Sequence, residues 1–491
     1  MASRTTRKPN APRPLAKVQA PRLRSGVREV EDSSEHFLSA LGWLADDTRG
    51  REATAERLAE SFLEQNQGIL RDMAITSDVR RQRGVPGIYL RTSTRVGAVP
   101  LLSPVTARPD FGLVVRPRFS WTSAGDMLAA TGFRCTPQIL TQLPELPQSE
   151  RRVPPWVMSA VVLPRLERLL ATLDRRFEVV AGDLRAPKGA VDWTQYATQR
   201  LPQGRALDVP CRWPDLRDDG DLLAAIHHVV QRHRSVLWLH RSAGRVVHAL
   251  LDRCTRMLHR LAGQPPRPPS AAIRRMWVQR PLQRSVFREG IQAVGWTVDE
   301  RGLAGLSDLE GLAWCMDMEV FFEAWTEAVA ERLARKTGGI VRAGRTLATR
   351  AGLDWRPAQL GTQRSLIPDV VVSRPDVALV LDAKYKRHAE ALQRNGGWAG
   401  MPESLRETHR DDLLQVLAYS ALVDAPRVVA CLAYPCPLER WQDLVARGRA
   451  WSRARVQGGP RPVDVAWCAL PMGGDPDLAA GMLAEMMREV G

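Results

Sequence analysis

The sequence predicts a multidomain α+β protein, and three observations indicate this class. Apolar residues recur at helical spacing over long stretches in the middle of the 491-residue chain, of which 156–177 is the clearest. Short β-branched runs among glycine and proline lie between residues 85 and 118. Near the C-terminus, two apolar runs flank a short polar turn and precede a helix and more strands, which is typical of an α/β domain.

We divide the chain into four parts on composition and periodicity. Residues 1–32 are expected to be a disordered basic tail, and 33–150 an N-terminal module with a small β-rich part. Residues 151–305 are expected to be mainly helical, and 306–491 to form the C-terminal α/β domain. A chain of this length is expected to hold several domains with ample core.

The basic tail contributes half of the charge excess. The first 28 residues carry eight Lys and Arg and no Asp or Glu, while the whole chain has a formal net charge of +16. This balance and the sequence pI of about 10.3 favour a polyanionic partner such as nucleic acid. The tail either adds nonspecific phosphate contacts or only solubilises the chain, and the sequence leaves both interpretations open.

Helices and short strands account for the chain up to residue 305. The β-rich stretch 85–117, with a strand at Phe111–Arg118, is either a docking module or an ordinary small barrel. Aromatic and cationic groups recur along the helix predicted at 270–294, and a solvated basic face is favoured over a DNA contact for them. They are Trp277, Arg280, Arg284 and Arg288. The predicted helices cover 33–43, 54–74, 156–177, 219–239, 241–261 and 270–294.

The stretch 366–386 carries the most informative residues. Two apolar runs, 366–372 and 377–383, surround the turn Ser373–Asp376, which predicts a β-hairpin. Both runs are nearly continuous in hydrophobicity, so the sheet is expected to be covered on both faces. Asp382 and Lys384 share one face of their strand because side chains alternate, and Asp369 on the partner strand can face the same side.

Charged side chains seldom lie in a buried strand unless they are paired or hold a metal. Carboxylate oxygens suit Mg²⁺ or Mn²⁺, and such an ion can polarise a phosphate. Lys384 can orient a water molecule and offset charge on a pentacovalent phosphate. The alternative is a structural salt bridge between Lys384 and an aspartate.

Three elements in order resemble the PD-(D/E)xK nucleases. Pro368-Asp369, twelve residues, and then Asp382-Ala383-Lys384 match the signature of that superfamily. Gln415 and Tyr419, four apart on one predicted helix face, resemble the Gln-x-x-x-Tyr helix of its RecB-like branch. With Phe321-Phe322-Glu323 upstream, the chain is most similar to McrC, the nuclease subunit of McrBC-type restriction systems.

The resemblance implies a role for each site residue. Asp369 and Asp382 would hold the metal, helped by Glu323 and by the backbone carbonyl of Ala383, with Glu319 as the fallback for the helical acid. Lys384 would position the attacking water. Gln415 and Tyr419 would orient the DNA backbone or the metal site. Lys386 would contact a phosphate.

The expected function is that of a Mg²⁺-dependent DNA endonuclease subunit in a restriction or anti-phage system. The sequence has no Gly-x-x-x-x-Gly-Lys-Ser/Thr string, so NTP hydrolysis would come from a separate AAA+ NTPase, a GTPase of the McrB kind. Two alternatives are a stand-alone RecB-like repair nuclease and a noncatalytic DNA-binding adaptor that regulates an NTPase.

Several other classes of protein are disfavoured. No stretch approaches eighteen consecutive apolar residues, so we expect a soluble, cytoplasmic protein without membrane contact. The seven cysteines show neither zinc-binding nor iron–sulfur spacing.

Overall fold

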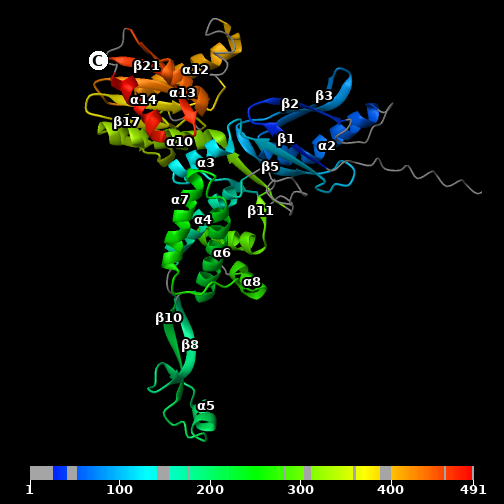
Figure 1. Cartoon of the computed structure of the whole chain (residues 1–491), viewed down its shortest axis with the longest axis vertical. Coiled ribbons are helices and arrows are strands. Elements are labelled where there is room, and N and C mark those ends of the chain that lie inside the picture. Colours follow the sequence, from blue (N-terminus) through cyan, green and yellow to red (C-terminus); the bar gives the residue numbers. More distant parts are fainter. Residues whose placement is uncertain are drawn as a thin grey trace, which may run out of the picture.

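The computed structural model describes residues 26–40, 52–140, 154–173, 176–217, 219–279, 284–303, 311–357, 361–387, 400–457 and 461–488. It confirms a mixed α+β chain built of several units (Figure 1). The sequence placed Gly26–Glu31 in a disordered tail, but these residues form strand β1, which pairs in parallel with β6. Long-range strand pairing overrides the disorder-prone composition there, and residues 1–25 lie outside the described residues.

The N-terminal region contains two sheets. The five-stranded sheet has the order β1-β6-β5-β13-β7, with β5 at Arg95–Leu101, β6 at Phe111–Arg116, β7 at Gln138–Ile139 and β13 at Trp314–Asp317. The three-stranded sheet has the order β2-β4-β3, with β2 at Glu35–Ser39, β3 at Thr76–Gln82 and β4 at Val85–Arg91. Helix α2, Glu52–Asp72, contributes Phe62 and Leu70 to a core shared with β4, β5 and β6.

The helix predicted at 33–43 is wrong over its described part. Residues 35–39 form β2, which pairs antiparallel with β4 from Glu35 against Arg91 to Ser39 against Gly87. The apolar pair Phe37 and Leu38 suits either structure locally, and pairing with β4 decides between them. Residues 41–43 lie outside the described residues.

Strand β13 shows that the predicted domain boundary at residue 306 is not a structural boundary. Trp314–Asp317 pair with β5 and β7 and therefore complete the N-terminal sheet. Helix α10, Met318–Thr337, follows without a linker, and Asp317 caps it by accepting a hydrogen bond from the amide of Glu319 at 2.9 Å. The N-terminal sheet and the C-terminal domain are thus joined rigidly at one residue.

The middle region is helical, as predicted, around the buried helix α4, Trp156–Thr172. The predicted helix at 270–294 is instead two helices, and Arg280 between them lies outside the described residues. The helices of this region are α6 at Gly220–Leu239, α7 at Arg245–Arg260, α8 at Ala271–Gln279 and α9 at Ser285–Val298. Helix α3, Trp121–Ala130, lies between this bundle and the C-terminal domain (Figure 1).

A long hairpin projects from the helical region, and we call residues 176–217 the stalk. Its strands β8, Arg176–Leu184, and β10, Val209–Arg217, pair antiparallel over their whole length. Short elements form its end, namely β9 at Ala190–Val191, α5 at Trp193–Gln195 and a π-helical turn at Tyr196–Arg200. Figure 1 shows the stalk extending away from the rest of the molecule, a feature that the sequence did not predict.

The C-terminal domain is built on a six-stranded sheet of order β14-β17-β18-β19-β21-β20. The predicted hairpin is confirmed as β17, Val370–Ser373, and β18, Ala378–Ala383, which pair antiparallel. Strands β18, β19 and β21 run parallel, and the two edge strands β14 and β20 run antiparallel to their neighbours. The other strands are β14 at Ile340–Ala343, β19 at Val428–Pro437, β20 at Trp451–Arg455 and β21 at Val463–Met472.

Helices cover both faces of this sheet, as its hydrophobicity predicts. Alternate residues of β17 and β18, such as Val372 and Leu381, share a core with α10 and with α14, Pro476–Arg488. The opposite face, with Val371 and Val380, packs against α12, Glu403–Ser420. Helix α13, Leu438–Ala446, buries Trp441 in the core on the α10 side.

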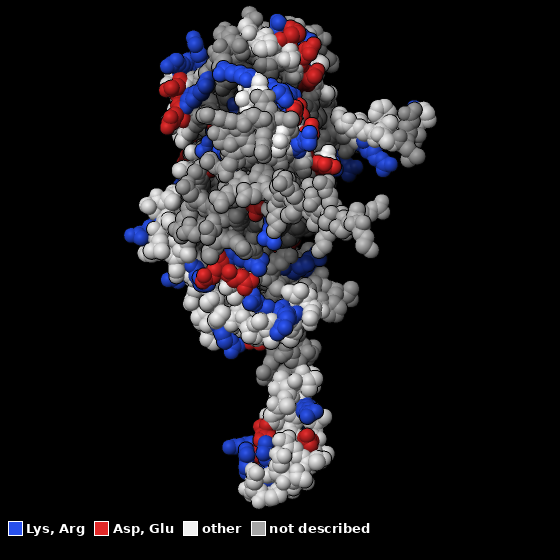
Figure 2. Space-filling view, turned by 90° about the vertical axis from the view of Figure 1, so that its right-hand side faces the viewer, with Lys and Arg blue, Asp and Glu red and all other residues white. Residues whose placement is uncertain are grey.

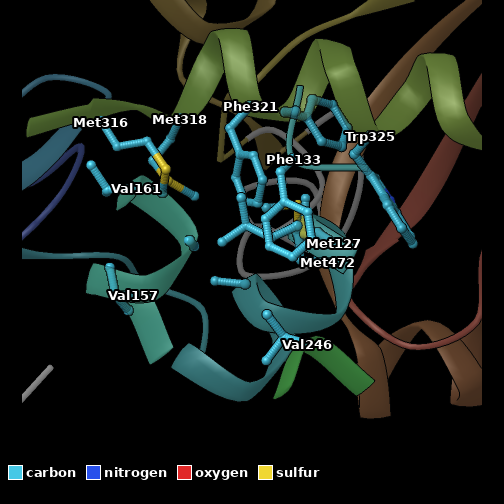
Figure 3. Close-up of a cluster of buried hydrophobic side chains, with 14 of the residues drawn as sticks. Met127, Phe133, Val157, Val161, Val246, Met316, Met318, Phe321, Trp325 and Met472 are labelled. Atoms are coloured by element: carbon cyan, nitrogen blue, oxygen red, sulfur yellow. The ribbon is translucent and has the colours of Figure 1, made fainter. Parts of the chain in front are cut away.

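One hydrophobic core joins the three regions. Figure 3 shows Met127 of α3, Val161 of α4, Met316 of β13, Phe321 of α10 and Met472 of β21 in one cluster. These elements come from the N-terminal, middle and C-terminal parts of the chain and bury their side chains against each other. No helix among the described residues has both the length and the apolar composition needed to cross a membrane.

The junction of β5 and β13 gives a prediction about stability. Gly97 has φ +153°, and a Cβ there would lie 2.1 Å from the carbonyl oxygen of Trp314. We therefore expect Gly97→Ala to lower the free energy of unfolding by about 2 kcal/mol or more, because strand backbone must shift. Gly68→Ala is the control, since a Cβ in that position of α2 meets no atom within 4 Å. Equal urea midpoints for the two variants would contradict the account.

Candidate active site

The pairing of β17 with β18 brings the two predicted carboxylates opposite each other. Val370 pairs with Leu381, so Asp369, one residue earlier, faces Asp382, one residue later. The backbone amide of Ala383 donates a hydrogen bond to Oδ2 of Asp369 at 2.8 Å, which fixes that side chain at the end of β18. Asp382 is 1% exposed. Both carboxylates lie on the sheet face that α12 covers.

Lys384 joins this pair from the same side of the chain. Its Nζ lies 2.8 Å from Oδ2 of Asp382 and donates a hydrogen bond to Oε1 of Gln415 at 2.9 Å. Gln415 in turn donates to the hydroxyl of Tyr419 at 2.8 Å. The two α12 residues therefore orient the ammonium group. Lys384 is itself held in register by its backbone amide, which donates to Ala433 of β19 at 2.8 Å.

The positive charge beside the two carboxylates comes from Lys384. Oδ2 of Asp382 is buried and lies 2.8 Å from Nζ of Lys384, which also donates to Gln415. Two ionised carboxylates beside one ammonium group keep a net negative charge, which is costly where it is buried. The arrangement therefore fits a divalent cation on chemical grounds.

Burial and mutual repulsion raise the pKa of every acid in the group. Burial, with the charges of Asp382 and Glu323, raises the pKa of Asp369 to about 8. The pKa of Asp382 is also raised, mainly by burial and against the attraction of Lys384. Burial alone would lower the pKa of Lys384, but the neighbouring carboxylates outweigh it and raise that pKa. These carboxyl groups resist simultaneous ionisation without a further positive charge.

Glu323 is the helical acid that interacts electrostatically with the pair. Burial, followed by the charges of Glu319, Asp317 and Asp382, raises its pKa to about 7. Glu319, the fallback, is exposed one turn earlier on α10. Among the described residues, no three His, Cys, Asp or Glu side chains are gathered closely enough to hold an ion by themselves. Glu323 thus lies within electrostatic reach of Asp369 and Asp382 without completing a ligand triad.

The oxygen set suits Mg²⁺ or Mn²⁺. Mg²⁺ is usually bound through one or two carboxylates, with water and substrate phosphate completing its octahedron. Asp369 and Asp382 would supply the carboxylates, and the carbonyl of Ala383 is the backbone candidate. Neither histidine nor cysteine belongs to the group described above, so softer metals are disfavoured.

Lys386 is engaged in an ion pair. Its Nζ donates to both carboxylate oxygens of Asp412, at 2.7 and 2.8 Å, and Asp412 is 4% exposed. His409 shares a hydrogen bond of 3.0 Å with the hydroxyl of Tyr434 beside them. The pair fastens the end of β18 to α12, and the predicted phosphate contact of Lys386 stays a prediction. Sequence analysis missed Asp412 and His409, which lack any motif spacing.

Comparison with known proteins gives limited information. No protein-family model matches the chain, and no curated protein matches it. It resembles a chain from the assembly of Thermococcus gammatolerans McrB AAA+ hexamers with bound McrC, at 15% identity and a TM-score of 0.41, over 95% of this chain and 100% of that chain. It also resembles a chain of the Thermococcus gammatolerans McrBC complex, at 13% identity and a TM-score of 0.26, over 62% of this chain and 88% of that chain. With TM-scores below 0.5, neither likeness establishes a common fold.

The raised pKa of Asp369 predicts how stability depends on pH. In the metal-free protein the folded state keeps a proton that the unfolded chain releases at its ordinary pKa near 3.8. Stability should therefore fall as the pH rises from about 4 to about 8. Asp369→Asn removes this contribution, so its unfolding temperature in EDTA should fall less steeply. Parallel curves for wild type and variant would show that Asp369 ionises normally.

Proposed function

We propose that the chain is a Mg²⁺- or Mn²⁺-dependent DNA endonuclease subunit of the PD-(D/E)xK type, acting in a restriction or anti-phage system under the control of a partner NTPase. The single observation that carries the proposal is the convergence of Asp369, Asp382 and Lys384 at the end of one hairpin. A buried and a half-buried carboxylate, both with raised pKa and beside an oriented ammonium group, would destabilise the fold if their role were purely structural.

The site residues can be given separate tasks in phosphodiester hydrolysis. A bound divalent cation supplies Lewis-acid polarisation of the scissile phosphate. Lys384 orients the attacking water and offsets negative charge that develops on the pentacovalent phosphate. Gln415 and Tyr419 keep the ammonium group in place through the hydrogen-bond chain that starts at its Nζ. Glu323, with its pKa near neutrality, is placed to exchange a proton with water at the metal site.

DNA is the proposed substrate because the chain is strongly basic and its signature resembles that of DNA nucleases. Figure 2 shows Lys and Arg interspersed with Asp and Glu over the described surface of one face, without a single continuous basic field there. The charge pattern of that face therefore does not indicate where DNA would bind. The active-site geometry carries the assignment, and the formal charge of +16 supports it.

The stalk is the proposed docking element for the partner NTPase. Toward its end, large apolar side chains are exposed, with Trp193 at 65%, Leu201 at 48% and Leu207 at 73%. Exposed apolar groups on a projecting element are typical of interaction surfaces. The stretch 85–117, for which the sequence left a docking module and a small barrel open, contributes Val99 and Phe111 to the N-terminal core. The exposed apolar side chains of the stalk make it the docking element of the proposal.

Cleavage of DNA by purified protein tests the catalytic assignment. We expect Asp382→Asn and Lys384→Met each to lower the cleavage rate on the order of 10²-fold or more, because each removes a charge that stabilises the transition state. Asp376→Asn is the matched control, since that aspartate lies in the exposed turn of the same hairpin. Cleavage by Lys384→Met at the wild-type rate, with Mg²⁺ and the partner present, would remove the assignment.

Docking can be tested separately from cutting. Trp193→Ser and Leu207→Ser should weaken binding to the NTPase encoded beside this chain, by on the order of tenfold each, since each removes an exposed apolar contact. Leu239→Ser is the control, because Leu239 is 77% exposed on the body of the molecule. Binding is measured by calorimetry with the Lys384→Met protein as well, where it should be unchanged. Unaltered affinity of both stalk variants would exclude the stalk as the docking element.

A further inference from the structure

Tyr385 lies directly after the proposed catalytic lysine and points to the other side of the chain. It is 3% exposed, and it shares the core of α10 rather than that of α12. A tight turn follows, in which the amide of Lys386 donates to the carbonyl of Lys384 at 2.7 Å. Tyr385 therefore lies between the two residues of this turn, so a shift of its backbone would also shift Lys384.

The hydroxyl of Tyr385 is held by a residue of the N-terminal region. It donates a hydrogen bond of 2.8 Å to Oδ2 of Asp32, which is fully buried. The other oxygen of Asp32 accepts from the backbone amide of Arg118 at 2.8 Å. The amide of Asp32 donates to the carbonyl of Arg116, at the end of β6, at 3.0 Å. Asp32 follows β1 directly, so the ends of two paired strands of the five-stranded sheet converge on Tyr385.

A buried arginine completes this contact. Cζ of Arg118 lies 4.4 Å from the ring centroid of Tyr385 and 5.1 Å from that of Phe119. Its three guanidinium nitrogens are buried and have no hydrogen-bond acceptor. The cation is therefore compensated by the charge of Asp32 and by the aromatic faces, and burial raises the pKa of Asp32 against the attraction of Arg118. Loss of the Arg118 charge would leave the buried Asp32 with only the weaker attraction of Arg387.

Tyr385 also contacts the second element of the site. Its ring lies 6.2 Å from the ring of Phe322, which immediately precedes Glu323 on α10, and 6.1 Å from that of Phe119. The side chain of the residue after the lysine thus lies against the neighbour of the helical acid and against the residues that follow β1 and β6.

We propose that Asp32, Arg118 and Tyr385 are positioning residues of the nuclease site, through which the N-terminal sheet fixes the ammonium group of Lys384. The inference rests on the proposed function, because it gives these residues a role in that reaction. The N-terminal sheet is then a required part of the cleavage site, and not only a docking module or a small barrel.

The test removes single polar atoms and leaves the packing in place. Tyr385→Phe deletes the hydroxyl, and Asp32→Asn deletes the charge while keeping an acceptor for the amide of Arg118. We expect each to lower kcat by on the order of tenfold with little change in KM for DNA, since displacement of a catalytic group affects the transition state most. Tyr89→Phe is the matched control, because that hydroxyl hydrogen-bonds to Glu35 in the three-stranded sheet.

A second measurement does not depend on cleavage. The rate at which an amine-directed reagent labels Lys384, relative to the exposed Lys336, is measured by mass spectrometry in the full chain. Tyr385→Phe and Asp32→Asn should raise this ratio several-fold, whereas Tyr89→Phe should leave it at the wild-type value. If the variants only destabilised the fold, labelling of buried groups would rise throughout the chain, and kcat would not fall selectively with KM unchanged. That result would contradict a positioning role.

The outcomes separate this inference from the proposed function. Wild-type protein that fails to cut DNA with its partner and metal present would overturn the proposed function, and the labelling ratio would still report whether Tyr385 positions Lys384. Wild-type protein that cuts DNA, while Tyr385→Phe and Asp32→Asn cut equally well with unchanged labelling, would overturn the inference alone.

Discussion

The structure of the candidate site depends on holding the half-buried Asp369 opposite the buried Asp382. Two carboxylates at adjacent ends of a hairpin repel, and burial strengthens that repulsion. The compensation comes from different elements, namely the Ala383 amide of β18, Lys384 after that strand, and α12, which orients the lysine through Gln415. The raised pKa of Asp369 shows that this compensation is incomplete without another cation. The proposed metal-dependent reaction would make use of this deficit.

Helix α10 connects this electrostatic problem to the rest of the molecule. It begins at Met318, directly after the last residue of β13, so it is anchored in the N-terminal sheet, and it packs with α14 on one face of the C-terminal sheet. Glu323 on this helix interacts electrostatically with the carboxylate pair, while Glu327 accepts hydrogen bonds from Arg134 at 2.8 Å and from Arg345 at 3.0 Å. The helix is therefore fixed on several sides, and its acid cannot move independently of the N-terminal sheet.

The sequence predicted the parts of the site that depend on local patterns. Alternation along β18 placed Asp382 and Lys384 on one face, and four-residue spacing placed Gln415 beside Tyr419 on α12. It did not reveal β1, the pairing of β13 with β5, or the contact of Tyr385 with Asp32, because each joins residues far apart in the chain and leaves no periodic signal. The sequence also did not predict the stalk, because the pairing of β8 with β10 across the intervening residues leaves no periodic signal. Lys386 matched a general preference for basic residues near phosphate, whereas its partner Asp412 became visible only in three dimensions.

The central claim is that the carboxylates of Asp369 and Asp382 hold a divalent cation against a DNA phosphate. Anomalous diffraction from crystals of Asp382→Asn and wild-type protein grown with Mn²⁺ and a DNA duplex tests this most directly. The account predicts an anomalous peak between Asp369 and Asp382 in the wild type, in contact with a phosphate oxygen, with Lys384 moved from Asp382 toward that phosphate. It also predicts that the peak is lost or strongly weakened in Asp382→Asn. A wild-type crystal with DNA bound, no Mn²⁺ at the pair, and Lys384 still at Asp382 would show that these residues form a structural salt bridge.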